Sequence, residues 1–267
     1  MIIKEITDYL DGLFPAEYQE DYDNTGLLVG NPGAETTGVL TTTDITDDVI
    51  DEAIAMGANL IVSHHPIIFG GLKRLTPQNT AGRLALRLAE RGICAYAAHT
   101  NLDNLACGVN GILAEKLGIV NCRILQVKGI SNEDDTFGAG MIGLLPSPMA
   151  LDDFIAMVKE RLHLPVVRAS KFKIKDSELK IKNVAICGGS GAFLIGDAIA
   201  AGADILLTAD LKYHDFQMAD NDIIVADIGH FESEQFAKEI FCNAISKKFS
   251  TFACRISEKD TGFIRYI

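Results

Sequence analysis

The sequence predicts an α/β protein made of two related lobes with mostly parallel sheets. Short apolar runs that read as buried strands alternate with stretches of helical periodicity, the order expected for parallel strands joined by crossover helices. The pattern of Ala55–Ser63, a helix end followed by a glycine and an apolar strand, returns at Ala200–Thr208. Such a repeat indicates two similar halves that face each other across a pseudo-twofold axis. We expect lobe one to cover about residues 1–128 and lobe two about residues 129–267.

Helix caps and apolar spacing define the elements expected in the first lobe. Apolar side chains at helical spacing predict an opening helix over Lys4–Leu13. The polar loop with Asp23 and Asn24 is typical of turn formation. Thr46 is expected to cap a helix that ends at Gly57, because hydroxyls favour the first position of a helix and glycines the position after its end. Further helices are expected over Asn79–Arg91 and Val109–Leu117, and strands over Val39–Thr43, Leu60–Ser63 and Ile93–Ala98.

The polar, glycine-containing stretch Lys128–Asp135 is expected to form the boundary between the two lobes. Strands are expected over Phe137–Leu145, Val166–Lys175, Val184–Cys187 and Ile223–Ile228, and helices over Leu151–Leu162 and Phe231–Lys247. A glycine turn, Gly188–Gly191, joins a strand to a helix. Its backbone N–H groups could cradle an anion, or the glycines could simply let the helix pack tightly on the strand. His163 is expected to be a cation at a helix end.

Composition and charge exclude several classes of function. The formal net charge is -12 and no cluster of basic residues interrupts it, which argues against a nucleic-acid-binding surface. The amino terminus lacks the apolar core of a signal peptide, and no apolar run approaches the length of a membrane span. We therefore expect a cytoplasmic protein. The six cysteines form no CxxC pair and are expected to be reduced core thiols.

Three predicted strand ends carry imidazoles, and two of them also carry a carboxylate four residues later. The residues are His64 and His65 before Pro66, His99 with Asp103, and His230 with Glu234. An isolated His-His pair is more often structural, and Asp103 is equally well explained as the cap of the next helix. The carboxyl ends of parallel strands, however, share the edge at which ligands bind. Imidazole and carboxylate donors together indicate a site for Zn, Mn, Fe or Ni.

The order of these motifs resembles that of the NIF-three-like family, whose members are often named GTP cyclohydrolase 1 type 2 homologues. The motifs are Tyr22–Leu27, Ser63–Pro66, His99–Asp103, Gly188–Gly191, Asp210–His214 and Gly229–Glu234. The resemblance covers nearly the full length and implies a single NIF-three-like domain, 1–267, around a central metal cleft. This sequence lacks the long insertion that some members of the family carry.

The resemblance also implies a ligand set and an assembly. The family's dinuclear ligands fall on His64, His65, Asp103, His230 and Glu234, with Glu234 bridging two divalent ions and the two adjacent histidines on different ions. This assignment favours the ligand role for Asp103. His99 and His214 then become candidates for proton transfer or contact with substrate, beside the ligands. Members of the family resemble one another as homohexameric rings with the metal sites facing an interior cavity.

A pair of metal ions can activate water near neutral pH and polarise an electrophile, so hydrolysis of a small molecule is the expected reaction. For ring opening of GTP at C8, His99 or His214 would move protons. A phosphoesterase or amidohydrolase acting on another small molecule is an alternative. A third reading is a non-catalytic, metal-dependent binding or regulatory module.

Overall fold

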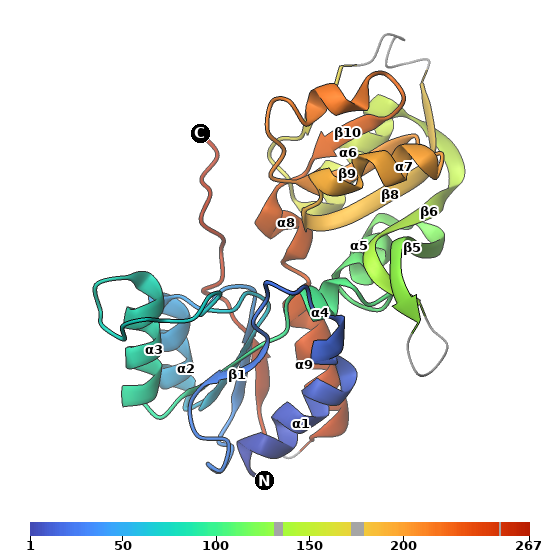
Figure 1. Cartoon of the computed structure of the whole chain (residues 1–267). Coiled ribbons are helices and arrows are strands. Elements are labelled where there is room, and N and C mark those ends of the chain that lie inside the picture. Colours follow the sequence, from blue (N-terminus) through green and yellow to red (C-terminus); the bar gives the residue numbers. More distant parts are fainter. Residues whose placement is uncertain (131–135, 172–178, 251) are drawn as a thin grey trace. The chain divides into compact units, whose positions relative to one another are not determined.

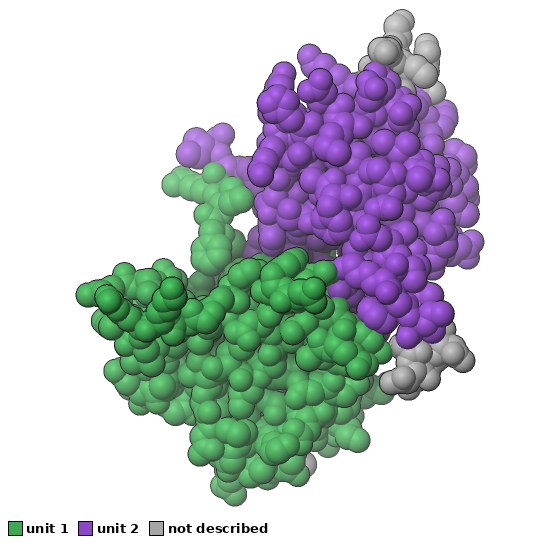
Figure 2. Space-filling view, in the orientation of Figure 1, with its two compact units in different colours: residues 1–102, 235–265 green, residues 103–234, 266–267 purple. Residues whose placement is uncertain are grey.

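The computed structural model describes residues 1–130, 136–171, 179–250 and 252–267 (Figure 1). These residues form two compact units (Figure 2): unit 1 is Met1–Leu102 with Gln235–Arg265, and unit 2 is Asp103–Glu234 with Tyr266–Ile267. This division differs from the predicted lobes, because residues 103–128 pack within unit 2 and residues 235–265 within unit 1. Among the described residues, none of the helices has the length and apolar character needed to span a membrane.

Unit 1 is built on a five-stranded sheet with the order β1-β4-β3-β2-β11. Its described strands are β1 (Gly26–Val29), β2 (Val39–Thr42), β3 (Leu60–Ser63), β4 (Cys94–Ala97) and β11 (Cys254–Ile256). All neighbours are parallel except β1, which runs antiparallel to β4. Its helices are α1 (Ile3–Leu13), α2 (Asp47–Met56), α3 (Thr80–Glu90) and α9 (Ala237–Lys248), with the short η1 (Ala16–Tyr18). The strands and helices predicted for the first 100 residues are thus confirmed within one or two residues.

The sheet of unit 1 is covered on both faces. Helices α2 and α3 lie on one face and α1 and α9 on the other (Figure 1). Leu40 and Ile61 belong to the buried cluster on the α2 and α3 side. On the opposite side, the rings of Phe14 and Phe241 pack edge to face with centroids 5.8 Å apart. The sheet is therefore a buried layer between two pairs of helices, with the carboxyl ends of four parallel strands at one edge.

Truncation of Phe241 tests how strongly α9 stabilises unit 1. The side chain is fully buried, so Phe241→Ala removes its apolar contacts and leaves a cavity. We expect the free energy of unfolding to fall by about 3–5 kcal/mol, measured by urea denaturation. Phe263→Ala is the matched control, because that ring is 76% exposed, and its loss is expected to change stability by less than about 0.5 kcal/mol. Equal effects of the two substitutions would contradict the described packing.

Unit 2 contains a six-stranded sheet with the order β5-β6-β8-β9-β10-β7. Its described strands are β5 (Val120–Ile130), β6 (Thr136–Ala150), β7 (Arg168–Ala169), β8 (Lys180–Ser190), β9 (Ile205–Ala209) and β10 (Ile224–Asp227). Its helical elements are α5 (Val109–Leu117), α6 (Leu151–Leu162), η3 (Ala192–Leu194), α7 (Ile195–Ala200), η4 (Phe216–Ala219) and α8 (His230–Glu234). Only β8, β9 and β10 are mutually parallel, so the expectation of mostly parallel sheets holds for unit 1 and only partly for unit 2.

Three details of unit 2 differ from the sequence prediction. Residues 128–130 belong to β5, and Ile130 pairs with Thr136 of β6, so this stretch leads into an antiparallel hairpin rather than a lobe boundary. Residues 131–135 lie outside the described part. The predicted edge strand Val166–Lys175 is the two-residue β7 antiparallel to β10, and residues 172–178 also lie outside the description.

The predicted helix Phe231–Lys247 is two helices, α8 and α9. Gln235 and Phe236 separate them, and the two helices belong to different units. Apolar periodicity continues across this break, which is why periodicity alone predicts one helix.

The internal repeat has the same local structure in both copies. Gly57 ends the first helix with φ 70°, and Gly202 occupies the corresponding position with φ 73°. Each glycine adopts the left-handed conformation that a helix end of this kind requires, and each is followed by a buried parallel strand, β3 or β9. The repeated sequence therefore encodes the same helix-turn-strand unit twice.

Candidate metal centre

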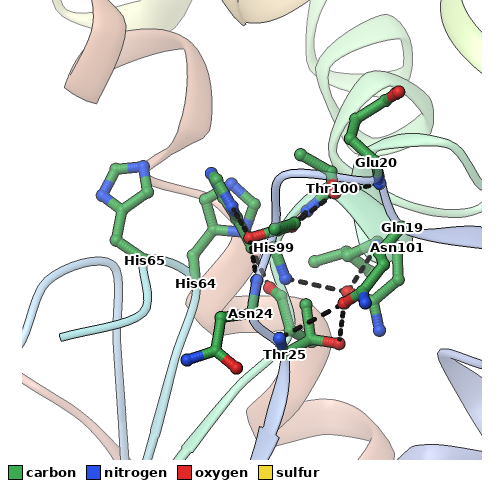
Figure 3. Close-up of polar contacts among 12 residues, drawn as sticks. Gln19, Glu20, Asn24, Thr25, His64, His65, His99, Thr100 and Asn101 are labelled. Atoms are coloured by element: carbon green, nitrogen blue, oxygen red, sulfur yellow. Dashed lines mark hydrogen bonds and ion pairs between the residues drawn. The ribbon is translucent and has the colours of Figure 1, made fainter. Parts of the chain in front are cut away.

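Three imidazoles gather at the carboxyl edge of the unit 1 sheet. His64 and His65 follow β3, and His99 follows its parallel neighbour β4, with Ser63 in register with Ala97. One ring nitrogen from each imidazole lies within 4.8 Å of those of the other two, as the close approach of the rings in Figure 3 illustrates. The ring centroids are 5.0 to 5.5 Å apart. Parallel pairing of the two strands thus brings together histidines that are distant in sequence.

The buried His64 ring is fixed in one tautomer. Its Nδ1 lies 2.9 Å from the carbonyl oxygen of Ala98. Because a carbonyl oxygen only accepts hydrogen bonds, Nδ1 carries the proton and Nε2 carries the lone pair. This is the form of histidine that binds a metal ion through Nε2.

Carboxylates orient the other two rings in the same way. His65 Nδ1 donates to Asp44 Oδ1 at 2.8 Å, and His99 Nδ1 donates to Asp23 Oδ1 at 2.8 Å. Burial raises the pKa of the Asp23 carboxyl, but hydrogen bonds from His99 and Thr100 outweigh burial and hold that pKa well below its usual value. Asp23 is therefore a charged acceptor at neutral pH. Carboxylate-to-histidine contacts of this kind accompany most metal-binding imidazoles.

The loop before β1 contributes more than the turn that the sequence indicates. Asp23 does accept a hydrogen bond from the backbone N–H of Asn24, as a turn residue would. It also holds His99, while Asn24 Nδ2 donates to the carbonyl oxygen of Ile68 at 2.6 Å. The loop therefore joins two segments beside the imidazoles.

In unit 2, α8 presents His230 and Glu234 on one side of a single turn. His230 Nε2 lies 2.9 Å from Glu234 Oε2, and its Nδ1 lies 2.7 Å from Asp210 Oδ2. Asp210 directly follows β9, and β10, which leads to His230, is its parallel neighbour. Asp210 adopts φ 56°, a left-handed conformation that aspartate tolerates better than most residues. The segments that follow β9 and β10 thus supply the Asp210 carboxylate and the His230 imidazole that it orients.

Asp103 lies close to Glu234 within unit 2. It ends the short helix α4 (Thr100–Asp103), whereas α5 begins at Val109 with Gly108 as its N-cap. Capping of the next helix therefore does not explain Asp103. One of its carboxylate oxygens lies within 4.8 Å of one from the buried Glu234, a spacing that suits a shared cation.

The glycine turn Gly188–Gly191 serves close packing. The N–H of Gly188 donates to Asn110 and that of Gly189 to Ser233, so these donors are used within the fold. Gly189 has φ 62°, and a Cβ there would overlap Oε1 of Glu234. Of the two open readings, the structure favours packing, with the added role of making space for the Glu234 carboxylate.

His214 is not brought to these groups. It lies in the exposed turn after Asp210, with its ring edge-on to Tyr213 at 5.3 Å, and it belongs to none of the candidate metal-binding groups found in the described residues. His163 ends α6 in a left-handed conformation, as expected for a helix-terminal residue.

Sequence analysis missed the carboxylates that orient the rings: Asp44 and Asp210, and the role of Asp23. The sequence did carry a signal for two of them. Asp44 lies two residues after the end of β2, and Asp210 directly follows β9. In both cases the neighbouring parallel strand, β3 or β10, leads to a histidine.

Asp210→Asn tests this orientation. Asparagine keeps the shape and tolerates the backbone conformation, but it can present an N–H to Nδ1 and removes the negative charge. We expect the metal affinity to fall by about 10–100-fold, measured by competition with a chromogenic chelator. Asp222→Asn, an exposed carboxylate at a turn, is the control and should leave the affinity unchanged. An unaltered affinity in the Asp210 variant would refute its supporting role.

Comparison with known proteins gives the family. The family model Duf34/NIF3 (NGG1p interacting factor 3) matches residues 1–261. The chain belongs to the NIF3 family.

Relatives in the NIF3 family match most of the chain. A GTP cyclohydrolase 1 type 2 homolog of Clostridium perfringens is 35% identical over 88% of this chain and 87% of the relative. One from Lactococcus lactis is 34% identical over 93% and 92%. The crystal structure of Staphylococcus aureus hypothetical protein SA1388 is 31% identical, with a TM-score of 0.90 over 100% of this chain and 99% of the other. The NIF3 fold expected from the motifs is confirmed.

Proposed function

We propose that this NIF3 protein is a hydrolase of a small molecule that depends on two divalent metal ions. Its ligands would be His64 and His65 from unit 1 and Asp103, His230 and Glu234 from unit 2. The observation that carries the proposal is the common state of the imidazoles: each Nδ1 donates to an oxygen, which leaves Nε2 as the ligand atom.

The donor chemistry of both units fits divalent first-row metals. Imidazole nitrogen and carboxylate oxygen suit Zn, Mn, Fe and Ni. His230 Nε2 and Glu234 Oε2 lie 2.9 Å apart, close enough for one cation to be bound by both side chains.

The path of the chain gives the proposal further support. The chain passes from unit 1 to unit 2 at Leu102–Asp103 and returns at Glu234–Gln235. Two of the proposed ligands, Asp103 and Glu234, therefore stand at the two crossing points of the chain. Glu234 is the proposed bridging carboxylate.

When bound, the ions would polarise a substrate oxygen and lower the pKa of water. His99 would accept and return a proton at Nε2, because the Asp23 carboxylate at its Nδ1 stabilises the protonated ring. His214 is the second candidate for this role, from its exposed turn after Asp210.

The substrate class rests on the names of relatives. Curated relatives are called GTP cyclohydrolase 1 type 2 homologs, so GTP is the first nucleotide to test. A phosphoester or an amide of a non-purine small molecule is the alternative substrate within the same chemistry. We also propose that the protein is cytoplasmic and forms a homohexameric ring. Light scattering of the metal-loaded protein would test the hexamer.

Metal analysis and turnover test the proposal together. The protein is loaded with Mn, Zn or Fe, its bound metal is identified by elemental analysis and an anomalous edge scan, and it is assayed on GTP and generic phosphoesters. We expect about two ions per chain and turnover that Glu234→Ala abolishes. Two bound ions without turnover on any substrate would favour the binding or regulatory module. Equal turnover by the variant would mean that a contaminant is responsible, and absence of bound metal would refute the centre.

A further inference from the structure

Two cysteines of unit 1 lie against each other. Cys242 is in the middle of α9, and Cys254 is the first residue of β11. The Cys242 sulfur lies 3.8 Å from the carbonyl oxygen of Cys254, so the two residues are in contact between α9 and β11. The Ser246 hydroxyl, one helical turn further along α9, lies 4.0 Å from the same sulfur. Both cysteines are partly exposed, so a small oxidant can reach them.

This pair is separate from the candidate metal centre. Cys254 is in register with Val39, the first residue of β2, which in turn pairs with Leu60 at the start of β3. The pair therefore lies at the amino edge of the parallel strands, whereas the imidazoles follow their carboxyl ends. Chemistry at the two cysteines would not use the metal ligands.

We propose that Cys242 and Cys254 form a redox-active dithiol that closes to an intramolecular disulfide when it reacts with a hydroperoxide. The sequence predicts reduced core thiols, and the structure holds both in the reduced form. The two cysteines are twelve residues apart in the sequence, and this spacing does not indicate that they react with each other. Their contact in the folded chain makes a disulfide between them possible.

The reaction balances with one molecule of peroxide. The Cys242 thiolate attacks an oxygen of hydrogen peroxide, so an S–O bond forms, the O–O bond breaks, and the leaving hydroxide takes up the proton that the Cys242 thiol released to become water. The Cys254 sulfur then attacks the Cys242 sulfur, so the S–S bond forms, the S–O bond breaks, and the leaving hydroxide takes up the Cys254 proton to become a second water. The peroxide is reduced and the two thiols are oxidised.

The surroundings assign the attacking role to Cys242. The hydrogen bond from the Cys254 thiol lowers the pKa of Cys242 against the opposing effect of burial, and the Ser246 hydroxyl lowers it further. The same contact and burial raise the pKa of Cys254. Cys242 is therefore the better nucleophile at neutral pH, and Cys254 resolves its oxidised form.

Peptide mapping of the full chain tests the proposal directly. The reduced protein is treated with hydrogen peroxide, blocked with N-ethylmaleimide and digested with trypsin without reductant. Cleavage after Lys238, Lys247, Lys248 and Arg255 places the two cysteines in different peptides, 239–247 and 249–255. We expect these peptides to be recovered as one disulfide-linked species, lighter than their sum by two hydrogen atoms.

Single substitutions separate the two roles. Cys254→Ser should accumulate a sulfenic acid at Cys242 that reacts with dimedone, whereas Cys242→Ser should leave Cys254 unoxidised at the same dose. Cys107→Ser is the matched control, because Cys107 is exposed and outside the pair, and it should form the link at the wild-type rate. Oxidation of Cys107 before any 242–254 link forms, or equal peroxide reactivity of Cys242 in all variants with no link, would overturn the proposal.

Discussion

His64→Ala is expected to reduce the metal affinity by more than the roughly 10–100-fold that loss of a supporting residue causes, because it removes a proposed ligand itself. His64 is fully buried with Nδ1 hydrogen-bonded to the carbonyl oxygen of Ala98, so the direction of its Nε2 is fixed. Isothermal titration of the metal-free protein with Zn or Mn measures the loss. Circular dichroism checks that the fold is kept.

His99→Ala is the matched comparison for His64→Ala. Both rings belong to the same cluster and both have an oriented Nδ1, but His99 is assigned to proton transfer rather than to the metal. Its loss should leave the number of bound ions unchanged and reduce turnover by about 10²–10⁴-fold on any substrate found. If the His99 variant loses metal and the His64 variant retains it, the assignment of ligands in unit 1 is reversed.

Gly189→Ala is expected to damage unit 2 and its ligands together. The new Cβ would overlap Oε1 of Glu234 and lie 3.1 Å from its Cδ, and φ of 62° is unfavourable for alanine. The backbone strain alone costs about 1–3 kcal/mol. Displacement of the Glu234 carboxylate should add a loss of metal affinity. Thermal unfolding and metal content of the same sample measure the two effects.

Gly196→Ala provides the control within unit 2. Gly196 lies in α7 and a Cβ there meets no atom within 4 Å, so alanine should stabilise the helix by about 0.5–1 kcal/mol. Metal content should stay at the wild-type level. A Gly189 variant that behaves like the Gly196 variant would show that the Glu234 side chain does not depend on the glycine turn.

The strand ends that carry the histidines were predictable because their signals are local. Pro66 ends the segment after His65, and the glycines at 57 and 202 mark the helix ends that feed β3 and β9. The supporting aspartates depend on which strands are neighbours. Asp23 and His99 are 76 residues apart, and only the antiparallel pairing of β1 with β4 brings their loops to one edge.

The boundaries of the two units could not be predicted from local sequence patterns, because they too depend on tertiary packing. Gln235 and Phe236 continue the apolar pattern of a helix, yet α8 packs in unit 2 and α9 in unit 1. Tertiary packing, and not periodicity, decides that the helix breaks there. The motif resemblance named the family correctly but carried no information on where the chain crosses between units.

The discontinuity of unit 1 has a consequence for biosynthesis. Residues 1–102 leave the ribosome long before α9, which covers one face of their sheet, and β11, which pairs with the edge of β2. Until those later segments arrive, the apolar face that α1 and α9 share is only partly covered and the edge of β2 is unpaired, and both features attract other chains. Residues 103–234, by contrast, emerge as one stretch. The order of assembly is therefore the reverse of the order of synthesis: the inserted unit can close first, and the unit that begins the chain is completed last.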